Sequence, residues 1–370
     1  MIVQKSGLRQ IDWPMLAAVL LLCLGGLLAI RSAVHADLKL RDLPRKEAVG
    51  VVLGLAALLA LALTDYETLL KRYARYLYPL NLLLLAVVLK LGHASHGAQR
   101  WISLGPLQLQ PSEFAKLILI CTLALSLTRR RDGIQTWPTL LKSFAHIGVP
   151  MLLIARQPDL GTALVLLAIW LGMTLMAGAR LSHLALLLMI GITLFAFLWH
   201  SGHVLKDYQK NRLQVFLNPD ADPRDTGYHL RQSEIAIGSG QISGEGYGRG
   251  LQSNGRFIPE QHTDFIFTVV GEEGGFAACV ALLALYLLVL ERGVVILAEC
   301  KDTLGRLLAA GVLSMLTFHI VVNVGMTLGI MPVVGVPLPF FSYGLSSLLV
   351  NLSAVGLLLS VAMRKHRVMF

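Results

Sequence analysis

Long apolar segments separated by short polar ones make up most of the chain. About ten of them approach the roughly 20 residues that a helix needs to cross a bilayer. Their predicted bounds are 13–33, 47–64, 70–91, 111–128, 139–155, 160–178, 181–200, 265–291, 303–331 and 340–363. The pattern predicts an all-α polytopic membrane protein. It forms a single integral membrane domain over residues 1–370, with one large loop at 201–264 between the seventh and eighth helices.

The composition agrees with this prediction. The 370 residues are 55% hydrophobic and 15% charged, with a mean hydropathy of +0.66, which is not typical of a soluble globular domain. The net charge of +10 suits a protein beside anionic lipids, or one that handles a phosphorylated substrate. The basic residues are scattered over many loops rather than gathered on one face, so no nucleic-acid partner is expected.

The distribution of Lys and Arg indicates the orientation in the membrane. Ten spans put both termini on one side. If that side is the cytoplasm, the inner segments hold sixteen Lys and Arg residues and the short outer loops hold eight. The positive-inside rule therefore favours cytoplasmic N- and C-termini in the cytoplasmic (inner) membrane. The large loop at 201–264 then lies outside.

The segment F-I-P-E-Q-H-T-D-F-I-F at 257–267 joins the large loop to the eighth span and holds the main candidate for chemistry. A carboxylate at the rim of a membrane helix is costly unless it faces water, a cation or a substrate. Two interpretations of Asp264 are open. Either Thr263 or Asp264 caps the helix that follows, or Asp264 has a functional role.

Other charged residues are predicted near the outer ends of the spans. Glu113 and Lys116 share a helix face, either as an ion pair that locks the helix or as the lining of a polar cavity. Asp159 can cap the sixth span. On the eighth span, Glu272 lies within a quadrant of Asp264, which favours Glu272 as a member of a shared polar site.

Two segments rich in glycine or proline, and a short amphipathic one, are predicted from the second half of the chain. The run G-S-G-Q-I-S-G-E-G-Y-G-R-G at 238–250 follows no strand and lacks G-K-[ST], so we expect a flexible loop rather than a phosphate loop. Residues 229–237 are expected to form a short amphipathic helix on the membrane. The run M-P-V-V-G-V-P-L-P-F-F-S-Y-G at 331–344 predicts a rigid, non-helical outer segment.

The order and spacing of several motifs over nearly the whole chain resemble the SEDS family (shape, elongation, division, sporulation; RodA, FtsW and SpoVE), and its RodA branch in particular. The motifs are G-A-Q-R-W at 97–101, Q-P-S-E-F-A-K at 110–116, Q-P-D-L-G-T at 157–162, G-Y-H at 227–229, Q-S-E-I-A-I-G-S-G at 232–240, P-E-Q-H-T-D-F-I-F at 259–267 and N-V-G-M-T-L-G-I-M-P-V-V-G-V-P-L-P-F-F-S-Y-G at 323–344. Two positions depart from the family pattern: Gln241 and Leu345 stand where the family often has glycine.

The resemblance implies a ten-helix peptidoglycan glycosyltransferase that polymerises lipid II on the outer face, for cell elongation and rod shape. It implies a class B penicillin-binding transpeptidase as partner, within an elongation complex of MreB, MreC, MreD and RodZ. It also implies that Asp264 is the catalytic residue. Glu113, Lys116 and Asp159 match positions that the family places around its central cavity.

The residues suit this chemistry. Joining two lipid-linked sugars requires a base for the acceptor hydroxyl, and we assign that role to Asp264, ionised at neutral pH. The lipid pyrophosphate that leaves needs positive charge. The candidates are Arg100, Lys116, Arg156, Arg212, Arg249 and Arg256. A divalent cation, Mg²⁺ or Mn²⁺, bound with Asp264 is the alternative.

Two other classes of protein compete with the enzyme. A lipid flippase or transporter also uses intramembrane charges and a central cavity. Here the charges gather at the outer ends of the spans, near the large loop, whereas a carrier is expected to hold more of them near mid-span. A structural scaffold does not account for the clustered carboxylates.

Overall fold

A computed structural model describes residues 11–364 except 38, 92, 96–97, 105–106, 130–132, 202–211, 213, 217, 219–221, 223–225 and 259. The helices are α1 (Trp13–Ala33), α2 (Leu43–Leu63), α3 (Tyr66–Leu91), α4 (Pro111–Thr128), α5 (Trp137–Arg156), α6 (Leu160–Met176), α7 (Leu181–Ser201), α9 (Thr226–Ser239), α10 (Leu251–Gly255), α11 (Ile266–Glu299), α12 (Thr303–Thr327) and α13 (Leu345–Arg364). A small antiparallel sheet joins β1 (His93–Ser95), β2 (Ala98–Leu104) and β3 (Leu107–Leu109). The pattern of apolar and polar residues did not predict these strands.

The predicted polytopic membrane fold is confirmed. Each predicted span overlaps one of α1–α7 or α11–α13, and α1 and α4 have the predicted bounds. Seven described helices, α1, α2, α4, α5, α11, α12 and α13, are long and apolar enough to cross a membrane. The eighth predicted span continues as α11 to Glu299, because the sequence after 291 stays apolar and helix-compatible.

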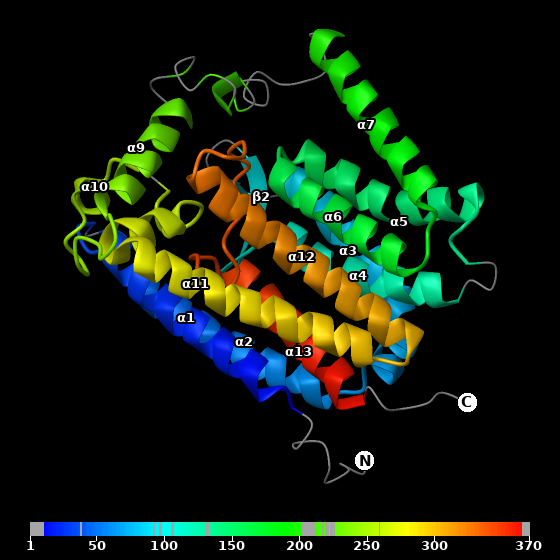
Figure 1. Cartoon of the computed structure of the whole chain (residues 1–370). Helices are drawn as coiled ribbons and strands as arrows, with labels where there is room; N and C mark the ends of the chain where they lie inside the picture. Colours follow the sequence, from blue (N-terminus) through cyan, green and yellow to red (C-terminus); the bar gives the residue numbers. More distant parts are fainter. Residues whose placement is uncertain are drawn as a thin grey trace.

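Helix α12 lies at the centre of the bundle. It packs against α4, α6, α11 and α13, while α13 runs along α2 and α1 runs along α11. In Figure 1, α1 begins and α13 ends at the same end of the bundle, and α9 and α10 cover the opposite end. α7 stands away from the other helices in this view. The central position of α12 explains how it keeps His319, Asn323 and Thr327 buried inside a membrane bundle.

The segment 331–344 is non-helical, as predicted. Its backbone carbonyls are bound by buried side chains: the Tyr286 hydroxyl donates to Pro339 O at 2.6 Å, and Asn323 Nδ2 donates to Val336 O at 2.7 Å. Irregular backbone at membrane depth is stable when protein satisfies its polar groups in this way. The segment therefore forms a wall beside the C-terminal half of α12.

Helix α11 is broken at Gly275, whose φ of 64° and ψ of −165° are not helical. The glycine-rich segment 238–250 fills the break. Four backbone hydrogen bonds join the two: Glu245 N to Glu272 O (3.0 Å), Gly246 N to Glu273 O (3.0 Å), Phe276 N to Gln241 O (2.8 Å) and Ala277 N to Ile242 O (3.1 Å). The expectation of a flexible loop is therefore wrong. The glycines allow close backbone approach rather than motion, and the sequence pattern fits both uses.

The amphipathic helix expected at 229–237 is present as α9, and it packs against α11 and α12. Its Ser233 hydroxyl is buried, lies 2.7 Å from Thr268 Oγ1 and donates to Thr327 O at 2.8 Å. α9 is therefore fixed to the bundle by polar contacts, in addition to any contact it makes with lipid.

Candidate active site

Asp264 lies in the turn immediately before α11 and does not cap this helix. The capping position belongs to Phe265, and among the described residues no side chain caps the first turn. The Thr263 hydroxyl donates instead to the backbone carbonyl and the carboxylate of Glu260, each at 3.2 Å. The capping interpretation of Thr263 and Asp264 is therefore wrong, and the Asp264 carboxylate remains available for another role.

The surroundings of Asp264 raise the proton affinity of its carboxylate above that of an aspartate in water. Burial raises the pKa of Asp264 from its usual 3.8 to about 6, and the nearby Glu260 carboxylate adds to the rise. Arg212 and Arg100 oppose it, and Asp159 raises it slightly further. A carboxylate with this pKa is mostly ionised at neutral pH and is a stronger base than an ordinary aspartate.

The wall segment 331–344 passes directly behind this carboxylate. Gly335 has a φ of 74°, and a Cβ atom added there would lie 3.1 Å from Asp264 Oδ2. Asn323 Nδ2 donates to the backbone carbonyl of Asp264 at 2.9 Å and also to Val336 O, so one amide joins the two segments. Arg212 Nη1 donates to Val334 O at 3.1 Å. The position of Asp264 therefore depends on this segment.

The five candidate arginines fall into two groups. Arg100 and Arg212 are close enough to lower the pKa of Asp264, and Arg100 is held by the carbonyls of Gln157 and Pro158. Arg156 and Arg249 are exposed. Arg256 is also exposed, and it forms an ion pair with Asp37 at 3.2 Å. The structure thus brings Arg100 and Arg212 to Asp264, and places the other three at the surface.

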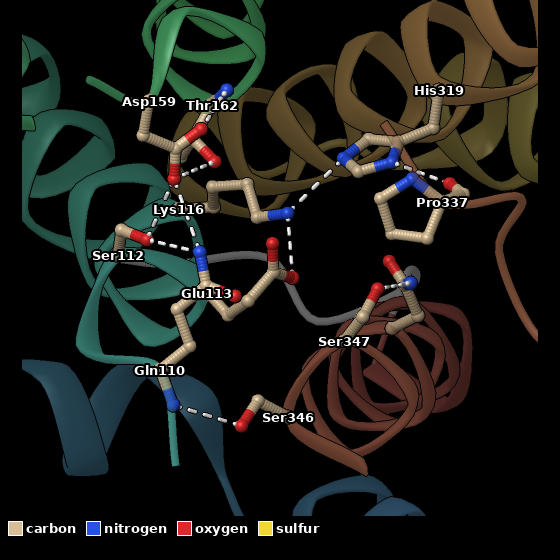
Figure 2. A network of polar contacts seen from close by, with 11 residues as sticks. Gln110, Ser112, Glu113, Lys116, Asp159, Thr162, His319, Pro337, Ser346 and Ser347 are labelled. Carbon is tan, nitrogen blue, oxygen red and sulfur yellow. Dashed lines mark hydrogen bonds and ion pairs between the residues drawn. The ribbon is translucent and has the colours of Figure 1, made fainter. Parts of the chain in front are cut away.

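Glu113 and Lys116, both on α4, form a buried ion pair that faces His319 on α12 (Figure 2). Lys116 Nζ lies 2.7 Å from Glu113 Oε2 and 3.1 Å from His319 Nε2. The other ring nitrogen of His319, Nδ1, lies 3.1 Å from the carbonyl oxygen of Pro337. The pairing predicted from the spacing is confirmed, and Lys116 is fully buried, with 0% of its surface exposed.

Asp159 caps α6, as its position in the sequence predicts, and both of its carboxylate oxygens accept hydrogen bonds (Figure 2). Oδ1 accepts from the backbone N–H of Thr162 at 3.2 Å. Oδ2 accepts from Thr162 Oγ1 at 3.0 Å, Gln110 Nε2 at 3.0 Å and Ser112 Oγ at 3.2 Å. Asp159 therefore ties the start of α6 to the start of α4.

The structure does not bring Glu272 to Asp264. Its buried carboxylate accepts hydrogen bonds from the backbone N–H groups of Gln252 (2.6 Å) and Ser253 (3.0 Å), and from the Ser253 hydroxyl. Glu272 thus holds α10 against α11. The helical-wheel prediction placed Asp264 and Glu272 on one helix, but α11 begins only at Ile266.

Glu260, His319 and Asn323 are parts of the site that the sequence did not single out. Glu260 stands in the same short motif as Asp264, and it acts on the proton affinity of that residue. His319 is an ionisable residue inside an apolar run, which by itself indicates a functional position in a membrane helix. Asn323 gave no local signal, because its two carbonyl partners come from distant segments.

The two departures from the family pattern have local explanations. Leu345 packs over Gly50 of α2, where an added Cβ atom would lie 2.7 Å from Leu345 Cδ1, so the glycine at 50 gives Leu345 its space. Gln241 has a φ of 47°, a conformation that favours glycine, and its carbonyl accepts the Phe276 N–H at the break of α11. Neither residue contacts Asp264 among the hydrogen bonds described.

Within the described part of the chain, no group of three or more His, Cys, Asp or Glu side chains is arranged to hold a metal ion. The protein side chains at Asp264 thus do not form a complete metal site. Mg²⁺ often uses one or two carboxylates together with substrate phosphates. Asp264 fits that smaller role.

Comparison with known proteins shows that the chain is similar to one family over almost its whole length. The family model described as cell cycle protein, covering FtsW, RodA and SpoVE, matches residues 12–367. The peptidoglycan glycosyltransferase MrdB of Escherichia coli K12 is 37% identical over 364 residues, covering 97% of this chain and 95% of MrdB.

Two solved structures have the same fold. The rod shape determining protein RodA of Thermus thermophilus has a TM-score of 0.72 and 32% identity, covering 96% of this chain and 98% of that chain. A chain from a structure of a peptidoglycan synthase complex that coordinates polymerization and crosslinking has a TM-score of 0.82 and 34% identity. The match covers 96% of this chain and 99% of that chain.

Proposed function

The chain belongs to the FtsW/RodA/SpoVE family and is a peptidoglycan glycosyltransferase, and on that premise we propose how it works. It polymerises lipid II into glycan strands at the outer face of the cytoplasmic (inner) membrane, for cell elongation and rod shape. Asp264 is the general base. The observation that carries this assignment is the Asp264 carboxylate itself. It lies at the outer end of α11, does not cap that helix, and has a pKa raised to about 6.

In the reaction, the acceptor hydroxyl attacks the anomeric carbon of the donor sugar. Its proton passes to the Asp264 carboxylate as the new glycosidic C–O bond forms. The bond from the anomeric carbon to the pyrophosphate oxygen breaks, and lipid pyrophosphate leaves with the bonding electrons. A positioned base contributes roughly 10²–10⁴-fold to such a step, and correct orientation of the two sugars contributes the rest.

Arg100 and Arg212 are the residues best placed to stabilise the pyrophosphate. Both lie within electrostatic reach of Asp264, and both have backbone carbonyls that fix part of the guanidinium. Guanidinium groups suit phosphate oxygens because their N–H groups are arranged as a planar fork. The competing arrangement is a Mg²⁺ or Mn²⁺ ion that Asp264 would help to hold and that would supply positive charge for the pyrophosphate. Omitting and restoring the ion in the polymerisation assay distinguishes the two.

The proposed partner is a class B penicillin-binding transpeptidase, within an elongation complex of MreB, MreC, MreD and RodZ. The similarity to a chain of a peptidoglycan synthase complex supports a crosslinking partner. The proposed orientation, with both termini in the cytoplasm, puts α9, α10 and Asp264 outside, where such a partner has its catalytic domain. Many spans suit this reaction because both substrates keep their lipid tails in the bilayer.

The test is polymerisation of purified lipid II by the chain co-purified with its transpeptidase. We expect Asp264→Asn to fold, insert and bind the transpeptidase, but to lose about 10²–10⁴-fold in rate, the usual loss for a positioned base. Asp42→Asn is the matched control, because Asp42 is an exposed outer aspartate that pairs only loosely with Arg45, at 3.9 Å. Long glycan strands from Asp264→Asn would overturn the proposed role. A protein that moves lipid II between vesicle leaflets without polymerising it would identify a flippase instead.

A further inference from the structure

His319 lies in the middle of the buried network, and the reaction proposed above gives it no role. The residue is 1% exposed, and its two ring nitrogens have partners that come from different parts of the chain (Figure 2). Nε2 faces the ammonium group of Lys116 on α4, and Nδ1 faces the carbonyl of Pro337 in the wall segment. His319 therefore links α4 to the segment behind Asp264.

The two partners determine which ring nitrogen carries the proton. The Pro337 carbonyl can only accept, so Nδ1 must carry the hydrogen and donate it. The Lys116 ammonium can only donate, so Nε2 must be the unprotonated acceptor. The contacts thus select the neutral Nδ1–H tautomer. Glu113 holds the Lys116 ammonium group in place at 2.7 Å, so the ion pair fixes the donor that faces His319.

The wall segment transmits this constraint to Asp264. His319 and Asn323 lie one turn apart on α12, and they hold the consecutive carbonyls of Pro337 and Val336. Gly335 immediately precedes this held pair and lies against the Asp264 carboxylate. Asn323 binds the backbone of Asp264 as well. A shift of the Pro337 carbonyl therefore changes the wall that the carboxylate rests on.

We propose that His319 is a positioning residue, whose tautomer is set by the Glu113–Lys116 pair and which fixes residues 335–337 against Asp264. The proposal rests on the proposed role of Asp264 as general base. It gives the buried ion pair a function without contact to substrate, as its complete burial requires. If the wall is released, the carboxylate loses its orientation and water reaches it. Orientation is worth up to about 10²-fold for a displacement of about 1 Å.

Three substitutions separate the two contacts of His319. His319→Asn retains an amide N–H near the position of Nδ1, so it can still donate to Pro337. His319→Gln retains an amide oxygen near the position of Nε2, so it keeps the Lys116 contact and loses the one to Pro337. His319→Phe keeps the ring shape and loses both. Thr317→Val is the control, on the exposed side of the same helix.

The measurements are kcat and KM for lipid II polymerisation across pH, normalised to folded protein complexed with its transpeptidase. We expect His319→Phe and His319→Gln to lower kcat by about 10- to 100-fold with KM within about twofold, because orientation rather than binding is lost. In the pH–rate profile, the midpoint of the fall in kcat at low pH should move from about pH 6 towards about pH 4, the value for a solvated aspartate. His319→Asn and Thr317→Val should keep both values close to those of the unmodified protein.

A merely structural role predicts a different result. The variants would then melt earlier or give less folded protein, while kcat per folded molecule and the midpoint of its fall at low pH stay unchanged. That result overturns the proposal, as does a His319→Asn variant as impaired as His319→Phe. Asp264→Asn is measured in the same assay. If it polymerises lipid II normally, the general-base assignment is at fault rather than the role of His319.

Discussion

Asp159 and Asp264 both stand at the beginning of a helix, and their carboxylates have opposite surroundings. Asp159 caps α6, and its two oxygens accept four hydrogen bonds from Thr162, Gln110 and Ser112. Asp264 precedes α11, leaves the capping position to Phe265, and has its pKa raised to about 6 by burial and by Glu260. Hydrogen-bond donors hold the Asp159 carboxylate in place, whereas the surroundings of Asp264 favour a proton.

The difference shows that the same residue type at the same kind of position can serve structure or chemistry. A carboxylate that accepts four hydrogen bonds from two segments suits a structural joint between α4 and α6. A carboxylate with a raised pKa can accept a proton near neutral pH, as a general base must. Environment rather than place in the sequence therefore separates the two roles.

The largest expected effect comes from making the same change at both positions. Asp264→Asn should lower polymerisation by about 10²–10⁴-fold, because the base is removed. Asp159→Asn should lower it by about tenfold or less, because asparagine is also a good helix cap and keeps an oxygen for the Thr162 N–H. Lipid II polymerisation by both variants, at equal amounts of folded complex, gives the ratio. Equal losses would mean that the two aspartates do not differ as described.

The next effect concerns the buried Glu113–Lys116 ion pair. Glu113→Gln should reduce folding yield and activity, because removing one partner leaves a buried charge, at a cost of about 3–5 kcal/mol. Adding Lys116→Met removes that charge and should recover the yield. It should recover little activity, since the His319 tautomer is then no longer fixed. Expression, melting temperature and polymerisation are measured on the single and double variants. Near-normal polymerisation by the double variant would show that the pair only balances its own charge.

The pH profile is a third way to sharpen the comparison. The general base works in its ionised form, and the pKa of Asp264 is raised to about 6, so activity should fall as pH drops through about 6. At one pH unit below that value about a tenth of the carboxylate is ionised, so the rate should be about a tenth of its plateau. An ordinary aspartate would keep its rate down to about pH 4. Initial rates between pH 4.5 and 8, with stability checked at each pH, decide between them.

The smallest expected effects are on stability, and they differ in sign. Asp159→Ala should lower the free energy of unfolding by about 1 kcal/mol or more, because a helix cap and its donors lose their partner. Asp264→Ala should leave it unchanged or raise it. A folded-state pKa above the unfolded value means that ionisation at pH 7 destabilises the folded state, so removing the group relieves that cost. Unfolding in mixed detergent micelles measures both, and a loss of stability in Asp264→Ala would contradict the description of its surroundings.

The sequence predicted those features that depend on neighbouring residues. Apolar length located the spans, Pro111 marked the start of α4, and the spacing of Glu113 and Lys116 indicated their pairing. Asp159 was recognisable as a cap because the helix it serves follows directly. Each of these inferences needs only one helix or the residues next to it.

The features that were missed, or predicted wrongly, depend on distant segments. Glu272 was assigned to the site of Asp264 from the angle between them on a helix, but its partners Gln252 and Ser253 come from α10. The contact of His319 with the Pro337 carbonyl depends on how the chain returns after α12. No local periodicity contains this information, because it arises only when the bundle has formed.

The break in α11 has a consequence for how the protein is made. A span leaving the ribosome enters lipid with its backbone groups paired internally, and each unpaired group there costs several kcal/mol. Around Gly275 that pairing comes from residues 241–246, which are synthesised before α11. In the proposed orientation, the segment that completes the helix is already outside when the outer half of α11 emerges. Biogenesis of this span is therefore coupled to correct export of the loop before it, and substitutions in that loop should reduce the amount of inserted protein as well as the activity of each molecule.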